Sequence, residues 1–257
     1  MRLISRLIIF IFLGIFCAGC ATAINPVTHR QEFILINTAS EVSIGNNMAK
    51  EIQAKYKLSN DAEKINRVQT VGMRVASASD RQDLQYHFNV IEDKEINAFA
   101  APGGYIYVNT GLLDAVSSDD ELAGVLAHEV GHVAALHSVK KIQAVLGYNI
   151  LASIALRSEK YNNIRKGVDT SVSLVMLGYS RQDELQADVL GVRYMRKAGY
   201  DPNGIVTFLE KMEEKEKKDP TSRLVFLRSH PYAGDRVKAV RAEIATSQAQ
   251  GQNVTLQ

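Results

Sequence analysis

The sequence predicts an α+β fold that is predominantly helical, with a small mixed sheet beside a central helix. Apolar residues recur at intervals of three and four along most of the chain, which is the period of an amphipathic helix. Two stretches, 84–92 and 104–113, are instead aromatic and β-branched and are typical of strands. The chain has 257 residues, of which 46% are apolar. These values suit one globular domain with a core large enough to need no disulfides.

The first twenty residues are expected to form a leader. They place Arg2 and Arg6 before an uncharged apolar run from 7 to 16 and end in small residues, which is the layout of a secretory signal peptide. The run is about half as long as the ~20 residues that a helix needs to cross a bilayer. Uncharged sequence continues to Ile24, so an uncleaved anchor is an alternative.

The leader ends in "CAGC", which resembles a bacterial lipobox in which Cys20 becomes the first mature residue and carries the lipid. Cys17 stands where leucine is usual, and an ordinary signal peptide that ends near Ala21 is the alternative. The resemblance implies a signal peptide over 1–19, and residues 20–40 are expected to be a tether because 21–40 show no clear period. Because position 21 is not aspartate, the resemblance also implies a lipid-anchored protein of the periplasm at the inner face of the outer membrane.

Cysteines and charge narrow the expected partners. Cys17 and Cys20 are the only cysteines, so the mature domain has no disulfide and no thiolate ligand for a metal. The net charge of +2 falls to about zero when Arg2 and Arg6 are removed with the leader. No cluster of lysine and arginine is dense enough to predict a nucleic-acid partner. Attachment to a membrane is therefore expected through acyl chains and not through a basic surface.

Helical spacing predicts the remaining elements in order. The predicted helical regions are 40–78, 119–145, 181–199 and 203–217. The region 40–78 contains a break, after which Ser59 or Asn60 is expected to cap its second helix. Asp119 or Asp120 is expected to cap the helix of 119–145.

Two apolar runs, 144–156 and 172–179, are each too short to span a membrane. Core packing, a lid over the core and an interface with a partner are the three interpretations of these runs. The glutamine-rich end, 246–257, is expected to be disordered, which bounds the globular domain at 41–245.

The stretch "LAHEVGHVAALHS" at 126–138 contains an HExxH motif. On a helix, His128 and His132 project from the same side one turn apart, so their nitrogens can bind one cation. Glu129 lies one position round, where it can hold a water molecule without binding the ion. This is the arrangement of a zinc hydrolase. Two surface histidines on an amphipathic helix are the alternative, but the surrounding residues are apolar and burial of unpaired polar groups would be costly.

A catalytic zinc ion has a third protein ligand and an open fourth position. His137 would lie on the opposite side of the same helix, and together with His29 and His87 it is interpreted as an ordinary surface or strand residue. "DELQAD" places Glu184 and Asp188 four apart on a later helix. Glu184 would complete the ligand set, and Asp188 would accept the free N–H of a zinc histidine. A solvated acidic face is the alternative for this pair.

The motifs HEVGH, ExxAD and SHP…R, in this order over about residues 40–243, resemble the HtpX, BepA, LoiP and Oma-type family of gluzincin metallopeptidases, and most of all its short bacterial lipoproteins. The resemblance implies a zincin-like core with one zinc ion per chain, held by His128, His132 and Glu184. It implies that Glu129 is the general base that takes a proton from the attacking water and returns it to the leaving amine.

The resemblance carries over three more residues. Asn97 opens a segment that in the family binds substrate along an extended strand. In the C-terminal element "SHPYAGDR", His230 would stabilise the tetrahedral intermediate or occupy the fourth zinc position in a resting state, and Arg236 would support the site from outside the ligand set. An ordinary histidine ahead of Pro231 is the alternative for His230.

Two functions follow from the resemblance and both stay open. The first is an endopeptidase that degrades misfolded or unassembled proteins of the cell envelope. The second is a periplasmic chaperone or assembly factor whose zinc site is mostly occluded. Both keep the same ligands, so both predict the same motifs.

Overall fold

The computed structural model of the chain describes residues 22–145, 177–218, 225–231 and 233–254. The predicted signal peptide, Cys20 and most of the two apolar runs lie outside the described residues. No helix in these ranges is long and apolar enough to cross a membrane.

A three-stranded mixed sheet lies beside the central helix, and the predominantly helical α+β fold is confirmed. Its strands are ordered β3 (His87–Ile91), β5 (Tyr105–Asn109) and β4 (Ala98–Ala101). β3 runs parallel to β5 and β4 runs antiparallel to it. The stretch between the two predicted strands thus supplies a strand of its own, and the second predicted strand ends early because Thr110–Ala115 form the short helix α4.

Helices lie in all the predicted regions, but two begin at other residues than expected, and the region 119–145 is not one helix: α5 ends at Ala134 and helix resumes at residue 137 after a turn. Asp61 caps α3, because its side chain accepts from the backbone N–H groups of Glu63 and Lys64. Ser118 caps α5 by accepting from the N–H of Glu121. The helices are α2 (Thr38–Lys55), α3 (Ala62–Ala76), α5 (Asp119–Ala134), α8 (Arg181–Lys197), α9 (Asn203–Lys218), α10 (Val225–Ser229) and α11 (Ala233–Val254).

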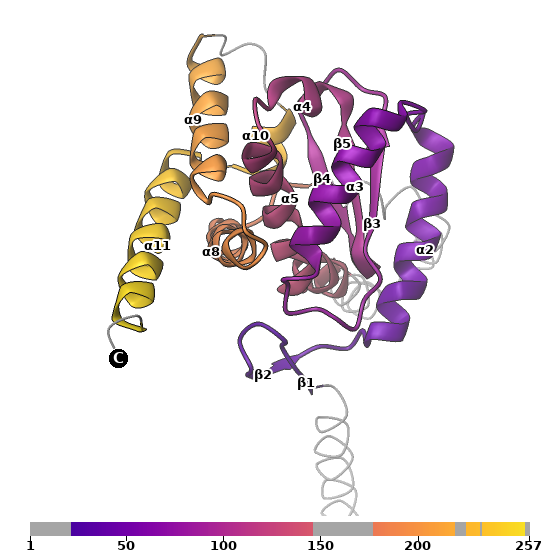
Figure 1. The fold of residues 1–257 in the computed structure, drawn as a ribbon. Coiled ribbons are helices and arrows are strands. Elements are labelled where there is room, and N and C mark those ends of the chain that lie inside the picture. The colour runs from indigo at the N-terminus through magenta and orange to yellow at the C-terminus, as the bar shows by residue number, and fades with distance from the viewer. Residues whose placement is uncertain (1–21, 146–176, 219–224, 232, 255–257) are drawn as a thin grey trace, which may run out of the picture.

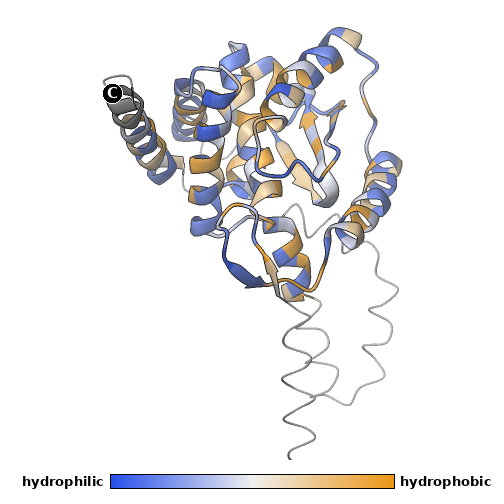
Figure 2. Ribbon diagram, turned by 60° about the horizontal axis from the view of Figure 1, so that its bottom comes forward, coloured by the Kyte–Doolittle hydropathy of each residue, from blue (hydrophilic) through white to orange (hydrophobic). Residues whose placement is uncertain are grey.

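Helix α5 runs through the middle of the molecule (Figure 1). Every residue of it from Glu121 to Ala134 is buried, and it packs against α3, α8, α9 and the edge strand β4. The surrounding helices are amphipathic, with hydrophilic residues over their outer faces (Figure 2). An apolar helix inside a shell of amphipathic ones is the arrangement that its composition requires.

The segment 22–36 contains a β-hairpin where a tether was expected. β1 (Thr22–Ile24) pairs antiparallel with β2 (Gln31–Phe33). The turn between the strands is closed by Asn25, whose side chain accepts from the N–H groups of Val27 and Thr28. The side-chain amide of Gln143 donates to the Phe33 carbonyl and accepts from the Leu35 N–H, as a neighbouring strand would. Strands of three residues are too short to show an alternating pattern in the sequence.

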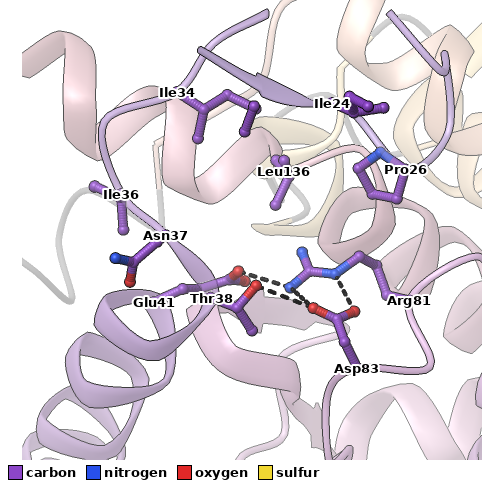
Figure 3. Close-up of a pocket in the computed structure, with 11 residues that line it drawn as sticks. Ile24, Pro26, Ile34, Ile36, Asn37, Thr38, Glu41, Arg81, Asp83 and Leu136 are labelled. Atoms are coloured by element: carbon purple, nitrogen blue, oxygen red, sulfur yellow. Dashed lines mark hydrogen bonds and ion pairs between the residues drawn. The ribbon is translucent and has the colours of Figure 1, made fainter. Parts of the chain in front are cut away.

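A cavity of about 270 Å³ lies between this hairpin and the body of the domain (Figure 3). On its floor Arg81 forms ion pairs with Glu41 at 2.9 Å and with Asp83 at 2.8 Å. The other oxygen of Glu41 accepts from the N–H of Gly103, which has φ of 76°. Glu41 therefore fastens α2 to the turn between β4 and β5 through Gly103, and to the segment after α3 through Arg81.

The C-terminal end is helical as far as Val254, which differs from the expected disorder after residue 245. Val240 and Ile244 are buried and anchor α11. Alanine and glutamine, which are frequent in the sequence that follows, are good helix formers. Composition alone had suggested disorder.

Candidate metal centre

Helix α5 presents His128, Glu129 and His132 to the interior. Their spacing on one helix face brings the two imidazoles together, and their Nε2 atoms are 3.0 Å apart. All three side chains are at most 1% exposed. The polar groups of this otherwise apolar helix therefore face the protein interior and not the solvent.

Helix α8 crosses α5 and brings Glu184 to the imidazole pair. Its oxygens lie 3.5 Å from Nε2 of His128 and 3.4 Å from Nε2 of His132. The crossing is close because Gly131 has no side chain: a Cβ atom there would stand 2.8 Å from the carbonyl oxygen of Ala187. The structure thus brings the three predicted ligands together from two helices.

His230 is the fourth member of the cluster and comes from the loop after α10. Its Nδ1 lies 3.2 Å from Nε2 of His128 and 3.2 Å from Oε1 of Glu184. One ligand atom from each of His128, His132, Glu184 and His230 lies within 4.8 Å of all the others. His230 therefore stands at the fourth ligand position of this structure.

The donor set fits a tetrahedral metal ion. Bonds of about 2.0–2.2 Å from one ion to four ligands give ligand-to-ligand distances of about 3.3–3.6 Å. The donor atoms of His128 lie 3.0 to 3.5 Å from those of the other three residues, and Glu184 lies 3.4 Å from His132 and 3.2 Å from His230. Buried atoms also lack hydrogen-bond partners here, among them Nε2 of His230 and both oxygens of Glu129. Such atoms are costly in a protein interior, and a cation beside them reduces that cost.

Glu129 stands next to the cluster without belonging to it. One of its oxygens lies 3.3 Å from Nε2 of His230, and within the described residues neither oxygen accepts a hydrogen bond. A buried carboxylate with both oxygens free is able to accept a proton from a group placed between it and the cluster. That is the position expected of a general base.

Asp188 and Arg236 contact His128 and Glu184 and hold their side chains in position. Oδ1 of Asp188 accepts from Nδ1 of His128 at 2.8 Å, which leaves Nε2 of His128 facing the cluster. Arg236 donates to both oxygens of Asp188, each at 2.8 Å, and its Nη1 lies 3.0 Å from Glu184. Burial would raise the pKa of Asp188, but Arg236 and His128 hold it below its usual value.

The two histidines of α5 have opposite electrostatic environments. Burial and Arg236 act to lower the pKa of His128, but the carboxylates of Asp188 and Glu184 outweigh them and raise it to about 9. Burial lowers the pKa of His132 well below its usual value. Without a cation His128 is therefore protonated at neutral pH, and binding of a metal ion releases its proton.

The interpretation of His137 as a surface residue is wrong. The side chain is 3% exposed, and its Nδ1 lies 2.9 Å from Nδ1 of His132, while its Nε2 contacts Gln186 at 3.1 Å. The helical-wheel argument fails because α5 ends at Ala134 and Leu136 has φ of 62°. This turn redirects the chain and brings His137 back to the ligand side, where it contacts the outer nitrogen of His132.

Tyr179 is a site residue that the motifs did not reveal. Its ring stacks on that of His132 with centroids 3.9 Å apart, and its hydroxyl lies 2.9 Å from Oγ of Ser138. Burial raises the pKa of its hydroxyl, so Tyr179 stays neutral. In the sequence, the only indication that Tyr179 lies near the site is its position directly before Ser180, the capping residue of α8.

Asn97 is buried at the start of β4. Its side-chain oxygen accepts from the hydroxyl of Ser229 at 3.3 Å, and Ser229 immediately precedes His230. β4 is an edge strand of the sheet, yet its four residues are buried. Asn97 therefore links the edge strand to the loop that carries His230.

Comparison with known proteins adds independent findings. The model of peptidase family M48 matches residues 62–244. The chain is 29% identical over 226 residues to mitochondrial metalloendopeptidase OMA1 of Schizosaccharomyces pombe, which covers 87% of the chain and 66% of that protein. It is 25% identical over 223 residues to the beta-barrel assembly-enhancing protease of Escherichia coli, covering 80% of the chain and 44% of that protein. The chain thus spans less than two thirds of the length of these relatives.

Proposed function

The chain belongs to peptidase family M48, and from this premise we propose that it is a zinc-dependent endopeptidase of the bacterial cell envelope that degrades misfolded or unassembled proteins. The family membership agrees with the resemblance carried by the three motifs. The observation that carries the proposal is the buried cluster of His128, His132 and Glu184 with the unpartnered carboxylate of Glu129 beside it. Both relatives are named as proteases, one of them as a metalloendopeptidase.

The chemistry of the donors favours zinc. Imidazole nitrogens with one carboxylate oxygen in a four-membered set are typical zinc ligands, and the chain offers no thiolate here. His128, His132 and Glu184 would hold a zinc ion in this position, and Asp188 would fix the tautomer of His128. Such an ion would supply Lewis acidity toward a carbonyl and toward water.

Glu129 is the proposed proton carrier. Its free oxygens accept the proton of the attacking water and then deliver it to the nitrogen of the scissile peptide bond. We propose that the substrate backbone pairs along β4, whose outer edge is not bonded to another strand of the described sheet. The Asn97 end of β4 lies nearest the His230 loop, so this pairing brings the substrate toward the cluster.

His230 is the proposed resting occupant of the fourth position. Its Nδ1 is as close to Glu184 as a ligand would be, at 3.2 Å. A substrate carbonyl needs the same position, so His230 has to leave it before peptide cleavage and is then free to stabilise the tetrahedral intermediate. Its place on a short loop between α10 and α11 makes such a movement independent of the ligand helices.

The cellular location rests on the sequence before residue 21. We propose that Cys20 carries a lipid and holds the domain in the periplasm at the outer membrane. Two acyl chains or more are required for stable attachment, which a lipoprotein cysteine provides.

One observation favours the second function, a chaperone or assembly factor. Every residue of the cluster, and Glu129 with it, is at most 1% exposed. In this conformation no peptide reaches the metal centre. A chaperone would bind its client proteins on the outer surface and would not need to cleave them.

A paired assay separates the two functions. Casein digestion is measured with and without a chelator, and prevention of aggregation is measured on the Glu129→Gln variant. For an endopeptidase we expect chelator and Glu129→Gln each to reduce cleavage by about 10²–10⁴-fold, with zinc content unchanged in the variant. The exposed Glu63→Gln on α3 is the matched control and keeps full activity.

Cleavage that persists in the Glu129→Gln protein removes Glu129 from the role of base. A wild-type protein that never cleaves casein, with a variant that prevents aggregation equally well, establishes the chaperone function instead.

A further inference from the structure

The β1–β2 hairpin carries exposed apolar side chains, of which Ile24 also lines the cavity beside the hairpin (Figure 3). Ile24, Phe33 and Leu35 are 66%, 60% and 59% exposed, and they are three of the five large hydrophobic side chains exposed in the described part of the chain. The other two are Met73 on α3 and Leu177. The hairpin lies at the lower edge of the molecule in two views (Figure 1, Figure 2).

The pairing of the strands places these three side chains on one face. Ile24 stands opposite Gln31, and partners in an antiparallel pair share a face. Phe33 follows Gln31 at the strand period of two and Leu35 follows Phe33. The chain is extended there, because the Phe33 carbonyl and the Leu35 N–H both bond to the amide of Gln143.

The opposite face of the hairpin packs on the domain. Glu32 forms an ion pair with Lys140, and Ile34 is buried against Leu136 and Val139. The hairpin is thus fixed to the end of the active-site helix and to the residues that follow it. Its exposed face is not the result of a loosely placed segment.

The exposed face has the composition of a membrane contact. Ile24, Phe33 and Leu35 are apolar, and Gln31, which shares their face, is polar but uncharged. No charged group on this face would have to be stripped of water when it enters the boundary between headgroups and acyl chains. Arg30, in the turn beside it, is exposed and long enough to reach lipid phosphates.

The position of the hairpin in the sequence indicates what its exposed apolar face contacts. β1 begins at Thr22, two residues after Cys20. Two residues span at most about 7 Å, so an anchor on Cys20 holds the hairpin at the bilayer surface. We propose that Ile24, Phe33 and Leu35 insert into the interfacial layer of the membrane that holds the anchor. The inference rests on the lipid anchor of the proposed function and adds a second, protein-borne contact that orients the domain.

The chain contains no tryptophan, so a single one reports on its own surroundings. Phe33→Trp is made in the full, lipid-modified chain and reconstituted into vesicles of phosphatidylethanolamine and phosphatidylglycerol with plain or brominated acyl chains. The matched control is Met73→Trp, at the 51% exposed Met73 on α3. We expect Trp emission at position 33 to shift to shorter wavelength and to be quenched severalfold by brominated lipid, and emission at position 73 to show neither change.

A second comparison tests the face itself. In the Phe33→Trp protein, adding Ile24→Asp and Leu35→Asp is expected to abolish most of the quenching, whereas adding Arg67→Gln on α3 leaves it unchanged. Flotation with the vesicles is recorded in the same samples. A protein that floats while position 33 behaves like position 73 overturns the membrane contact and leaves the anchor intact. A protein that does not float overturns the anchor and the contact together. A blue shift that ignores brominated lipid and grows with protein concentration assigns the face to a second copy of the chain and also overturns the proposal.

Discussion

At the scale of single residues, the site depends on how Arg236 is held. The guanidinium reaches Asp188 through two donors at 2.8 Å each and lies 3.0 Å from Glu184, all of them buried. It neutralises part of the negative charge that Glu184 and Asp188 would otherwise concentrate in the interior. Through Asp188 it also fixes the orientation of His128.

Arg236→Lys should weaken metal binding. Lysine keeps the charge but cannot donate two parallel hydrogen bonds to Asp188, so His128 loses its fixed orientation. Loss of such a supporting partner lowers metal affinity by about 10–100-fold. Zinc titration against a competing chelator measures this. Arg241→Lys on the same helix is the control, because its pair with Glu210 is exposed. Equal affinities in the two variants would mean that Arg236 acts only as a charge.

At the scale of elements, the crossing of α5 and α8 sets the distance between the imidazoles and Glu184. Gly131 lies at the closest approach, where a Cβ atom would come within 2.8 Å of the Ala187 backbone oxygen. The atoms that such a Cβ would meet belong to the backbone of Ala187, so no flexible side chain can move aside. The helix-breaking cost of glycine is therefore offset by a close contact that the metal centre requires.

Gly131→Ala should separate the two helices. Alanine usually stabilises a helix interior, but here overpacking is expected to cost about 1–3 kcal/mol of unfolding free energy. The displaced Glu184 should also weaken zinc binding. Denaturant unfolding and zinc titration provide the two readouts. Gly234→Ala, whose nearest contact would be a side-chain atom at 3.6 Å, serves as the control and is expected to be neutral. A Gly131→Ala protein as stable and as metal-competent as this control would contradict the close-crossing account.

The sequence predicted the elements that carry a period and missed those that depend on a single turn. The spacing of His128 and His132, and of Glu184 and Asp188, follows from regular helix geometry, so their faces were predictable. The inward turn of His137 depends on the backbone of Leu136, for which leucine gives no signal because L side chains rarely adopt its φ of 62°.

The hairpin and the end of α11 were missed for a related reason. β1 and β2 have three residues each, and besides pairing with each other they are held by the side-chain amide of Gln143, which lies in a helical segment 108 residues after Leu35. Such contacts leave no local pattern. The edge position of β4 likewise depends on pairing with β5 and not on its own residues.

At the scale of the whole molecule, the metal centre joins distant parts of the chain. His128 and His132 come from α5, Glu184 from α8 and His230 from the loop after α10. At this site Nε2 of His230 and both oxygens of the neighbouring Glu129 have no hydrogen-bond partner. The bound ion should therefore stabilise the packing of the C-terminal helices on the central one.

Removal of the metal should lower the melting temperature. An ion present at about 1,000 times its dissociation constant adds about 4 kcal/mol, which corresponds to about 8–16 °C for a domain of this size. Calorimetry with and without chelator measures the shift. A chain whose melting temperature is the same in both conditions would show that the cluster is assembled without help from an ion.

The most direct test of the account is the zinc content of the wild-type protein and of Glu184→Ala, measured by elemental analysis on purified, tag-free chains. The account predicts one zinc ion per wild-type chain and a sharp loss in the variant, because the carboxylate from α8 is one of the three proposed protein ligands. The exposed Glu63→Ala should keep the wild-type content. A full zinc content in Glu184→Ala, with the fold intact by circular dichroism, would contradict a metal centre that joins α5 to α8.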